Sequence, residues 1–264
     1  MIRKARPSDA ADIAALLHDS FDVALTPYMA YLQPGIDAFL RSRIAHSWSA
    51  SDRRFWVSYG DGRLLAFAET QQFEADTQFL SYICVAEHAR GRGLASSLIA
   101  HWLDAESAIG TVMLDVHANN GPARRLYERL GFEADSTALW LRRPLPEPAE
   151  PVMAADLHVA QACLDTYGFA ELQLLHESVP RIGLLGHTVV RVTSLSSLYD
   201  DALLARIASA FPERREAFAI VPSEQVERAA LGNPGGIILE SIRMAASASE
   251  IRARLARVGS HVPK

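Results

Sequence analysis

The segment from residue 85 to residue 96 contains the residues whose types and spacing point most directly to chemistry. It follows a predicted strand and opens a predicted helix. Gly91 and Gly93 allow the backbone to approach a ligand closely, because they have no Cβ. Unpaired amides and the helix dipole attract anions at the start of a helix, and Arg90 and Arg92 add positive charge. The segment therefore predicts a site for a phosphate or pyrophosphate group.

Two other interpretations of these glycines remain open. A tight structural turn between a strand and a helix would also use Gly91 and Gly93. A Rossmann dinucleotide site is the second alternative, and Asp115 lies at about the distance of that fold's acidic residue. Two features argue against a Rossmann site. Four residues separate Val85 from the arginine-glycine loop, whereas a Rossmann glycine turn follows its strand directly, and Ser96 stands where that motif has its third glycine.

A second motif lies downstream, and the two motifs together resemble a known family. The first is Arg90-x-x-Gly93-x-Ala95, and the second is Asn120-x-x-Ala123-x-x-Leu126-Tyr127-x-x-x-Gly131-Phe132. Both resemble hallmarks of the GNAT superfamily, the general N-acetyltransferases, over about residues 1–143. The resemblance implies an α/β fold with a mixed, mostly antiparallel sheet that splays at two parallel central strands and is flanked by helices. It also implies acetyl-CoA as the acyl donor.

The resemblance assigns roles to individual positions. The donor would lie where strands 79–85 and 112–116 diverge, and Asn120 would contact its pantetheine arm. Tyr127 would face the thioester sulfur and act as general acid for the departing thiolate. The strand backbone that would pair with pantetheine belongs to Ile83, Cys84 and Val85. The amides that would hold the pyrophosphate belong to Arg90, Gly91, Arg92, Gly93, Leu94, Ala95 and Ser96.

The implied reaction is direct attack by a neutral amine, so a base must remove its proton. Many relatives carry a glutamate on the strand before the pyrophosphate loop, but residues 79–85 contain no carboxylate. Glu69, Asp115 and His117 are the candidates. Each also has a structural interpretation, Glu69 as a solvated strand residue and the other two as local capping or pairing groups.

Acceptor residues are expected between the first two helices, where GNAT relatives build the acceptor-side wall. Tyr28, Met29 and Tyr31 lie there, and ordinary packing is the equal alternative. Cys84 is expected to be a small core residue rather than a nucleophile, since no activating base is evident. No His-x-x-x-His or Cys-x-x-Cys spacing predicts a metal site, and no Gly-x-Ser-x-Gly nucleophile elbow is present.

Composition limits the class of protein further. Of 264 residues, 49% are hydrophobic and 22% charged, which is typical of globular chains. A net charge of -5 makes nucleic acid an unexpected partner. The 2 cysteines predict reduced thiols in a cytoplasmic setting rather than a disulfide framework. Neither a signal peptide nor a membrane span is expected.

Sequence periodicity predicts interleaved strands and helices before residue 144. A helix capped by Ser8 follows the first strand, and Gly60-Asp61-Gly62 predicts a hairpin turn. The predicted strands are 1–5, 54–59, 63–73, 79–85, 112–116 and 132–141, and the further helices are 35–49, 93–107 and 122–130.

The remainder is predicted to be a separate, smaller α/β domain. Four prolines at 144, 146, 148 and 151 predict a linker over 144–152. Residues 153–264 would select the acceptor, form a dimer interface or be a degenerate second GNAT half. Residues 160–172 faintly resemble 126–139, as a decayed repeat would. The predicted helices are 153–166, 200–211 and 249–258, and the strands are 170–176, 184–193, 217–221 and 237–244.

The sequence thus predicts an acyl-CoA-dependent N-acyltransferase acting on a small-molecule or peptide amine. A homodimer is a further possibility, and a longer acyl chain could replace acetyl. The alternative is a CoA-binding sensor or interaction protein without catalysis, because the strand before the loop lacks a carboxylate.

Overall fold

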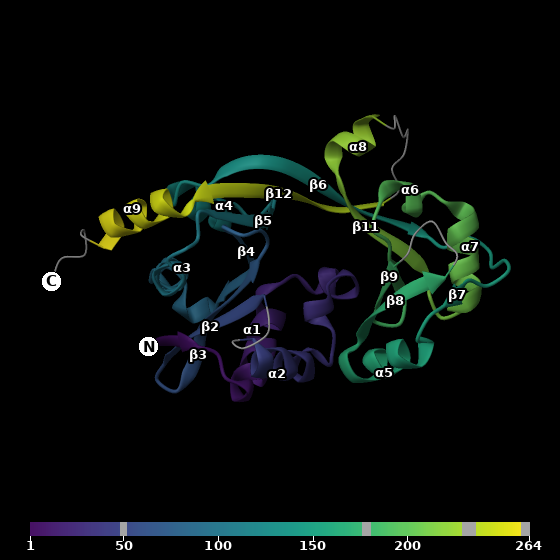
Figure 1. Cartoon of the computed structure of the whole chain (residues 1–264), viewed down its shortest axis with the longest axis horizontal. Coiled ribbons are helices and arrows are strands. Elements are labelled where there is room, and N and C mark those ends of the chain that lie inside the picture. Colours follow the sequence, from purple (N-terminus) through teal and green to yellow (C-terminus); the bar gives the residue numbers. More distant parts are fainter. Residues whose placement is uncertain (48–51, 176–180, 229–235, 260–264) are drawn as a thin grey trace. The chain divides into compact units, whose positions relative to one another are not determined.

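The computed structural model describes residues 1–47, 52–175, 181–228 and 236–259 (Figure 1). The chain divides into two compact units that are each built from separate segments. Unit 1 contains Met1–Phe21, Phe39–Ser136 and the C-terminal segment from Ile242, and unit 2 contains Asp22–Ala38 and Thr137–Ser241. The boundary between the units is therefore not a single point at the proline-rich segment, since the C-terminal part of the chain belongs to unit 1 again.

Unit 1 contains a sheet that begins with β1 (Ile2–Lys4), β2 (Arg53–Gly60), β3 (Arg63–Gln72), β4 (Thr77–Val85) and β5 (Thr111–His117), in that order. The first four strands are antiparallel, and β4 and β5 are parallel. The predicted hairpin is confirmed, because Asp61 (φ 52°) and Gly62 (φ 73°) turn the chain between β2 and β3. Both adopt the left-handed conformation that such a turn requires.

The parallel pair diverges partway along its length. The β4–β5 pairing ends at Leu80 and Leu114, although both strands continue beyond it. At the same point the β3–β4 register shifts, so that Ser81 is an extra residue on β4. Such a bulge bends a strand and increases its twist. The sequence prediction of two diverging central strands is therefore confirmed.

Helices cover both faces of the unit 1 sheet. The helix α1 (Ala10–Ser20) contacts β3 and β4 on one face, and α2 (Ile36–His46) follows it in the chain. On the other face, α3 (Leu94–Ala105) and α4 (Gly121–Arg129) contribute to a core that includes Trp56, Leu80, Leu98 and Trp102. These helices agree with the sequence prediction because their apolar residues recur with helical spacing.

The C-terminal segment completes unit 1. The strand β12 (Gly236–Ser247) follows β5 in the strand order, and β6 (Glu133–Pro144) follows β12. The last helix, α9 (Ala248–Gly259), packs on α3 and places Ile251 in the same core. Ser247 accepts a hydrogen bond from the Glu250 amide (3.2 Å) and caps the start of this helix.

Unit 2 repeats the strand order of unit 1. Its strands run in the order β7 (Met153–Ala154), β8 (Phe169–Leu175), β9 (Arg181–Leu185), β10 (Val189–Arg191), β11 (Glu216–Pro222) and then the second part of β6. Only β10 and β11 are parallel. Unit 1 likewise has four antiparallel strands, a parallel neighbour and then a long strand from a distant part of the sequence. The helices of unit 2 are α5 (Leu157–Tyr167), α6 (Leu195–Leu198), α7 (Asp201–Ala210) and α8 (Ser223–Arg228).

Two predicted helix starts are wrong. Ser8 lies in a short 3-10 helix (Pro7–Asp9), and Asp9 occupies the position before α1. The Asp9 carboxylate instead accepts hydrogen bonds from Arg3 (2.7 and 2.9 Å) and from the Arg6 amide (2.7 Å). The helix predicted over 153–166 begins only at Leu157, because β7 pairs with β8 before it.

Other differences arise from turns that periodicity does not detect. The strand predicted over 184–193 is two strands, since Gly186 (φ 51°) reverses the chain between β9 and β10. The helix α8 was not predicted. The two segments that resemble each other in sequence, 126–139 and 160–172, do not occupy equivalent places in the two units. The first forms α4 and part of β6, and the second forms parts of α5 and β8. The ends of predicted helix 35–49 and strand 170–176 lie outside the described residues.

Candidate functional site

The glycine loop joins β4 to α3 through a 3-10 turn (Glu87–Ala89). Gly91 (φ 77°) and Gly93 (φ 76°) both adopt the left-handed conformation. A Cβ at either position would meet no atom within 4 Å. Glycine is therefore required here by the backbone conformation and not by crowding.

The backbone amides of residues 91–96 are open at the start of α3, and this segment is called the cradle below. Within the described chain they have no hydrogen-bond acceptor, and the first helical bond runs from the Ser97 amide to the Gly93 carbonyl (2.9 Å). Gly93 has no side chain to cap α3. Arg90 and Arg92 are both exposed at this loop, and Arg90 Nε donates to the Val85 carbonyl (3.2 Å). Open amides, the helix dipole and two guanidinium groups together suit an anion.

An open strand edge lies beside the cradle. Ile83, Cys84 and Val85 pair with β3 on one side, whereas the β4–β5 pairing has already ended at Leu80. A strand edge of this kind can accept an extended ligand through main-chain hydrogen bonds. The cradle and the edge are continuous along the chain.

Tyr127 lies on α4 and is buried in the unit 1 core. Its ring packs edge-on against Phe132 at 5.6 Å between centroids. Burial raises the pKa of the Tyr127 phenol well above its usual value near 10, and the nearby Cys84 thiol acts in the same direction. The hydroxyl is therefore protonated at neutral pH.

Asn120 directly precedes α4, and Pro122 lies in the first turn of that helix. Its side-chain oxygen accepts a hydrogen bond from the Ala123 amide (3.2 Å). This contact is an ordinary helix cap. The contact of Asn120 with a pantetheine arm stays a prediction.

Cys84 is buried on the α1 face of β4, and its side chain contacts Ser20. Burial raises the pKa of the thiol to about 11, although the Ser20 hydrogen bond and the charge of Arg90 act in the opposite direction. At neutral pH the group is a thiol rather than a nucleophilic thiolate.

The three candidate bases all lie on the α1 face of the sheet. Glu69 is fully buried and forms an ion pair with Arg53, so it is not a solvated strand residue. Asp115 accepts two hydrogen bonds from Arg243, from Nε and from Nη2, both at 2.8 Å. Burial lowers the pKa of the His117 imidazole below its usual 6.5, so this ring is neutral at pH 7.

The predicted acceptor residues belong to unit 2. Tyr28 is buried, donates a hydrogen bond to Glu216 (2.9 Å) and accepts one from Arg142 (3.1 Å). Met29 and Tyr31 are also buried. Each residue therefore has a packing role, and contact with an acceptor stays a prediction.

Sequence reasoning missed three side chains near the diverging strands. Arg243 reaches Asp115 from β12, and its guanidinium lies over the Phe79 ring at 5.3 Å. Phe21 and Tyr82 form a ring cluster with His117. Aromatic residues are common packing groups in strands, so the sequence carried no signal that distinguished Tyr82 from Phe79.

Unit 2 has no comparable cradle at the equivalent connection. Between β10 and β11, the Ser194 hydroxyl accepts a hydrogen bond from the Ser197 amide (3.1 Å). The Asp200 carboxylate accepts one from the Leu203 amide (2.9 Å) at the start of α7. At both helix starts a side chain therefore already accepts a hydrogen bond from a backbone amide. The Asp200 carboxylate is also negatively charged, so it would repel a phosphate group. The β10–β11 pairing also continues to the end of β10, so these strands do not diverge there.

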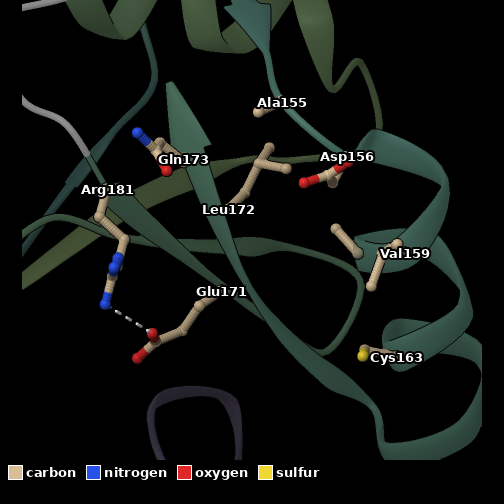
Figure 2. Close-up of a pocket in the computed structure, with 9 residues that line it drawn as sticks. Ala155, Asp156, Val159, Cys163, Glu171, Leu172, Gln173 and Arg181 are labelled. Atoms are coloured by element: carbon tan, nitrogen blue, oxygen red, sulfur yellow. Dashed lines mark hydrogen bonds and ion pairs between the residues drawn. The ribbon is translucent and has the colours of Figure 1, made fainter. Parts of the chain in front are cut away.

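A pocket of about 320 Å³ lies elsewhere in unit 2, between α5 and β8 (Figure 2). Glu171 and Arg181 form an ion pair at 3.5 Å on one side, and Cys163 lies on the other. Both charged side chains are largely exposed, so this pair contributes little to binding or stability.

Within the described residues no cluster of three or more metal-ligating side chains occurs, and no helix could cross a bilayer.

Comparisons with known proteins agree with the geometry of unit 1. Residues 12–132 match the model of the Acetyltransferase (GNAT) family. The chain is 35% identical over 100 residues to the [ribosomal protein bS18]-alanine N-acetyltransferase of Salmonella typhimurium, covering 33% of this chain and 67% of that protein. It is 34% identical over 108 residues to mycothiol acetyltransferase of Mycobacterium sp. (strain JLS), covering 38% of this chain. The chain spans only 36% of the length of that relative.

The fold of almost the whole chain is also found in a solved structure. A tandem GNAT protein from the clavulanic acid biosynthesis pathway superposes with a TM-score of 0.64. The match covers 94% of this chain and 98% of that one, at 15% sequence identity. The likeness concerns the fold and includes unit 2, which no sequence motif identified.

Proposed function

Because the chain belongs to the acetyltransferase (GNAT) family, we propose that it transfers an acetyl or other acyl group from acyl-CoA to a primary amine. One observation carries the proposal: the open amides of residues 91–96 lie at the end of the strand that diverges from its parallel neighbour. The cradle suits a pyrophosphate, and the edge at residues 83–85 suits a pantetheine arm. Both parts of the donor would thus bind to one continuous segment.

The proposed reaction forms a C–N bond and breaks the thioester C–S bond. A neutral amine attacks the carbonyl carbon, and a backbone amide near Val85 stabilises the developing oxyanion. Tyr127 donates a hydrogen bond and then a proton to the departing thiolate. The proton lost by the amine passes to a base on the α1 face.

Of the candidate bases, we favour His117. Its low pKa keeps the imidazole neutral and able to accept a proton near pH 7. Asp115 is the second candidate, and its two oxygens would first have to loosen the ion pair with Arg243. Glu69 is the third and is the most buried, with Arg53 as its partner.

We further propose that unit 2 is a second GNAT half without a donor site. The shared strand order and the tandem GNAT fold support this origin. The capped helix starts at Ser194 and Asp200 argue against a second pyrophosphate site. The chain should therefore bind one acyl-CoA. A role for unit 2 in acceptor selection and the formation of a homodimer both stay predictions from the sequence.

Calorimetry with acetyl-CoA, desulfo-CoA and NAD tests the donor site directly. We expect both CoA compounds to bind with a stoichiometry of one and NAD not to bind. Binding of NAD alone would restore the Rossmann alternative, and binding without thiol release on any amine would favour the sensor. A series of acyl-CoA chain lengths would identify the preferred donor.

A charge placed in the cradle provides a matched variant. Ser96→Asp introduces a carboxylate in the first turn of α3, where it stabilises a helix but repels a pyrophosphate. We expect the Kd for acetyl-CoA to rise at least about tenfold, because charge-assisted hydrogen bonds to the amides are each worth about 1.5–3 kcal/mol. Ser107→Asp, an exposed position beyond the end of α3, makes the same charge change and should leave the Kd unaltered. Equal Kd values for the two variants would reject the cradle as the donor site.

A further inference from the structure

Three aromatic rings form a cluster on the α1 face of unit 1. Phe21 follows the last residue of α1, and its ring lies 6.1 Å from Tyr82 on β4 and 6.3 Å from His117 on β5. The interplanar angles are 81° and 62°, so both contacts are edge-to-face. All three side chains are half-buried, which leaves part of each ring accessible.

The cluster lies where the two parallel strands have separated. Pairing between β4 and β5 ends at Leu80 and Leu114, and Tyr82 and His117 come after these residues on their strands. The Phe21 ring therefore bridges the two diverging strands on the face that α1 covers. Backbone hydrogen bonds no longer join the strands at this point, and side-chain contacts take their place.

The same face contains the candidate bases of the proposed reaction. Side chains two residues apart on a strand share a face, so Cys84 accompanies Tyr82 and Asp115 accompanies His117. Cys84 contacts Ser20, the residue before Phe21, and influences the Tyr127 phenol. The ring cluster thus contains one candidate base, His117, and has Asp115 on the same face, while Cys84 connects this face to Tyr127.

The chemistry of this surface favours a flat apolar group next to an amine. Aromatic faces attract cations and pack edge-to-face with further rings. The candidate carboxylates of this face are both paired: Asp115 with Arg243 through two hydrogen bonds, and Glu69, which lies opposite Tyr82 on β3, with Arg53. The surface therefore offers no net charge for an acidic or a strongly basic acceptor, and selection falls to the rings.

We propose that Phe21, Tyr82 and His117 form the acceptor wall and select a primary amine that carries an aromatic group on a short linker. This inference rests on the proposed acyl transfer and specifies its acceptor. It places the wall on unit 1 at the diverging strands, rather than at Tyr28 and Tyr31.

A pair of amines that differ in the ring tests the proposal kinetically. We expect the full chain to use 2-phenylethylamine with a kcat/KM at least about tenfold above that of n-butylamine. Tyr82→Leu should raise the KM for 2-phenylethylamine about tenfold and leave the KM for acetyl-CoA unchanged. Tyr82→Phe, which retains the ring, should keep the preference. Phe73→Leu, a change at an exposed aromatic residue just after the end of β3, should have no effect.

A binding measurement separates this proposal from the transfer reaction itself. Saturation-transfer NMR with 2-phenylethylamine and desulfo-CoA requires no turnover. A ring signal in the wild-type protein that is lost in Phe21→Leu and Tyr82→Leu supports the wall, even if thiol release fails and the proposed transfer is rejected. Equal use of the two amines, or a ring signal unchanged in both folded variants, would overturn the acceptor wall while leaving the donor site intact.

Discussion

Replacing Tyr127 by phenylalanine tests the chemical step most directly. The change removes a hydroxyl group and retains a ring that packs on Phe132. Among the described residues, this hydroxyl has no hydrogen-bond partner, so its removal leaves no other polar group unsatisfied. We therefore expect the free energy of unfolding to change by less than about 0.5 kcal/mol.

The catalytic effect of the same change should be much larger. The thiolate that leaves has a pKa of about 8.5 by analogy with cysteine, and a phenol that donates to it assists C–S cleavage. General acids of this type contribute about 10²–10⁴ in rate. We expect kcat to fall by at least about 100-fold, with the KM for acetyl-CoA nearly unchanged. Because burial raises the pKa of Tyr127, this group should give no alkaline limb below pH 10.

Thiol release at saturating amine, together with thermal unfolding, would measure both effects. Tyr199→Phe is the matched control, because the Tyr199 hydroxyl of unit 2 is also buried and the same atom is removed. We expect Tyr199→Phe to retain the wild-type kcat. A folded Tyr127→Phe enzyme within threefold of the wild-type kcat would refute Tyr127 as the general acid.

The remaining predictions concern pH dependence, thiol reactivity and stability. If His117 is the base, the acid limb of kcat/KM should have its midpoint below 6.5, and His117→Asn should remove that limb. At pH 8 an aromatic disulfide reagent should react rapidly only with Cys163, which lines the pocket, because burial raises the pKa of Cys84 to about 11. Rapid reaction of two thiols would contradict this prediction. Burial alone would raise the pKa of Asp9, but its hydrogen bonds lower it, so its stabilisation is present above about pH 4 and is lost in acid. Asp9→Asn should thus cost about 1.5–3 kcal/mol at pH 7, with the difference from wild type in urea unfolding narrowing below about pH 4. Arg214→Met should destabilise unit 2 by about 2–4 kcal/mol in the same assay. The reason is that Arg214 Nη1 donates hydrogen bonds to three carbonyls (2.8–3.1 Å) around the β9–β10 turn. An unchanged unfolding midpoint would show that water replaces these bonds.

Local rules were sufficient for the parts of the fold that depend on neighbouring residues. The Gly60-Asp61-Gly62 turn and the loop at Gly91 and Gly93 follow from backbone conformations that few residues can adopt, and the helix that contains Tyr127 is followed by another such residue, Gly131 (φ 92°). Each of these predictions needed only a short window of sequence. The errors at Ser8 and at residues 184–193 arose where a distant partner or one further turn changed a locally reasonable pattern.

The sequence by itself determined the conformation of the loop at residues 90–96, because glycine adopts the positive φ angles found at Gly91 and Gly93 more readily than any other residue. Only the tertiary structure decided what surrounds it. Arg243 lies 128 residues from Asp115 and reaches it because β12 follows β5 in the sheet. The Phe21 ring meets Tyr82 and His117 only because a bulge separates two parallel strands beneath the end of α1. A strand's sequence specifies which side chains share a face, but not which distant strand becomes its neighbour, since many pairings satisfy the same alternation.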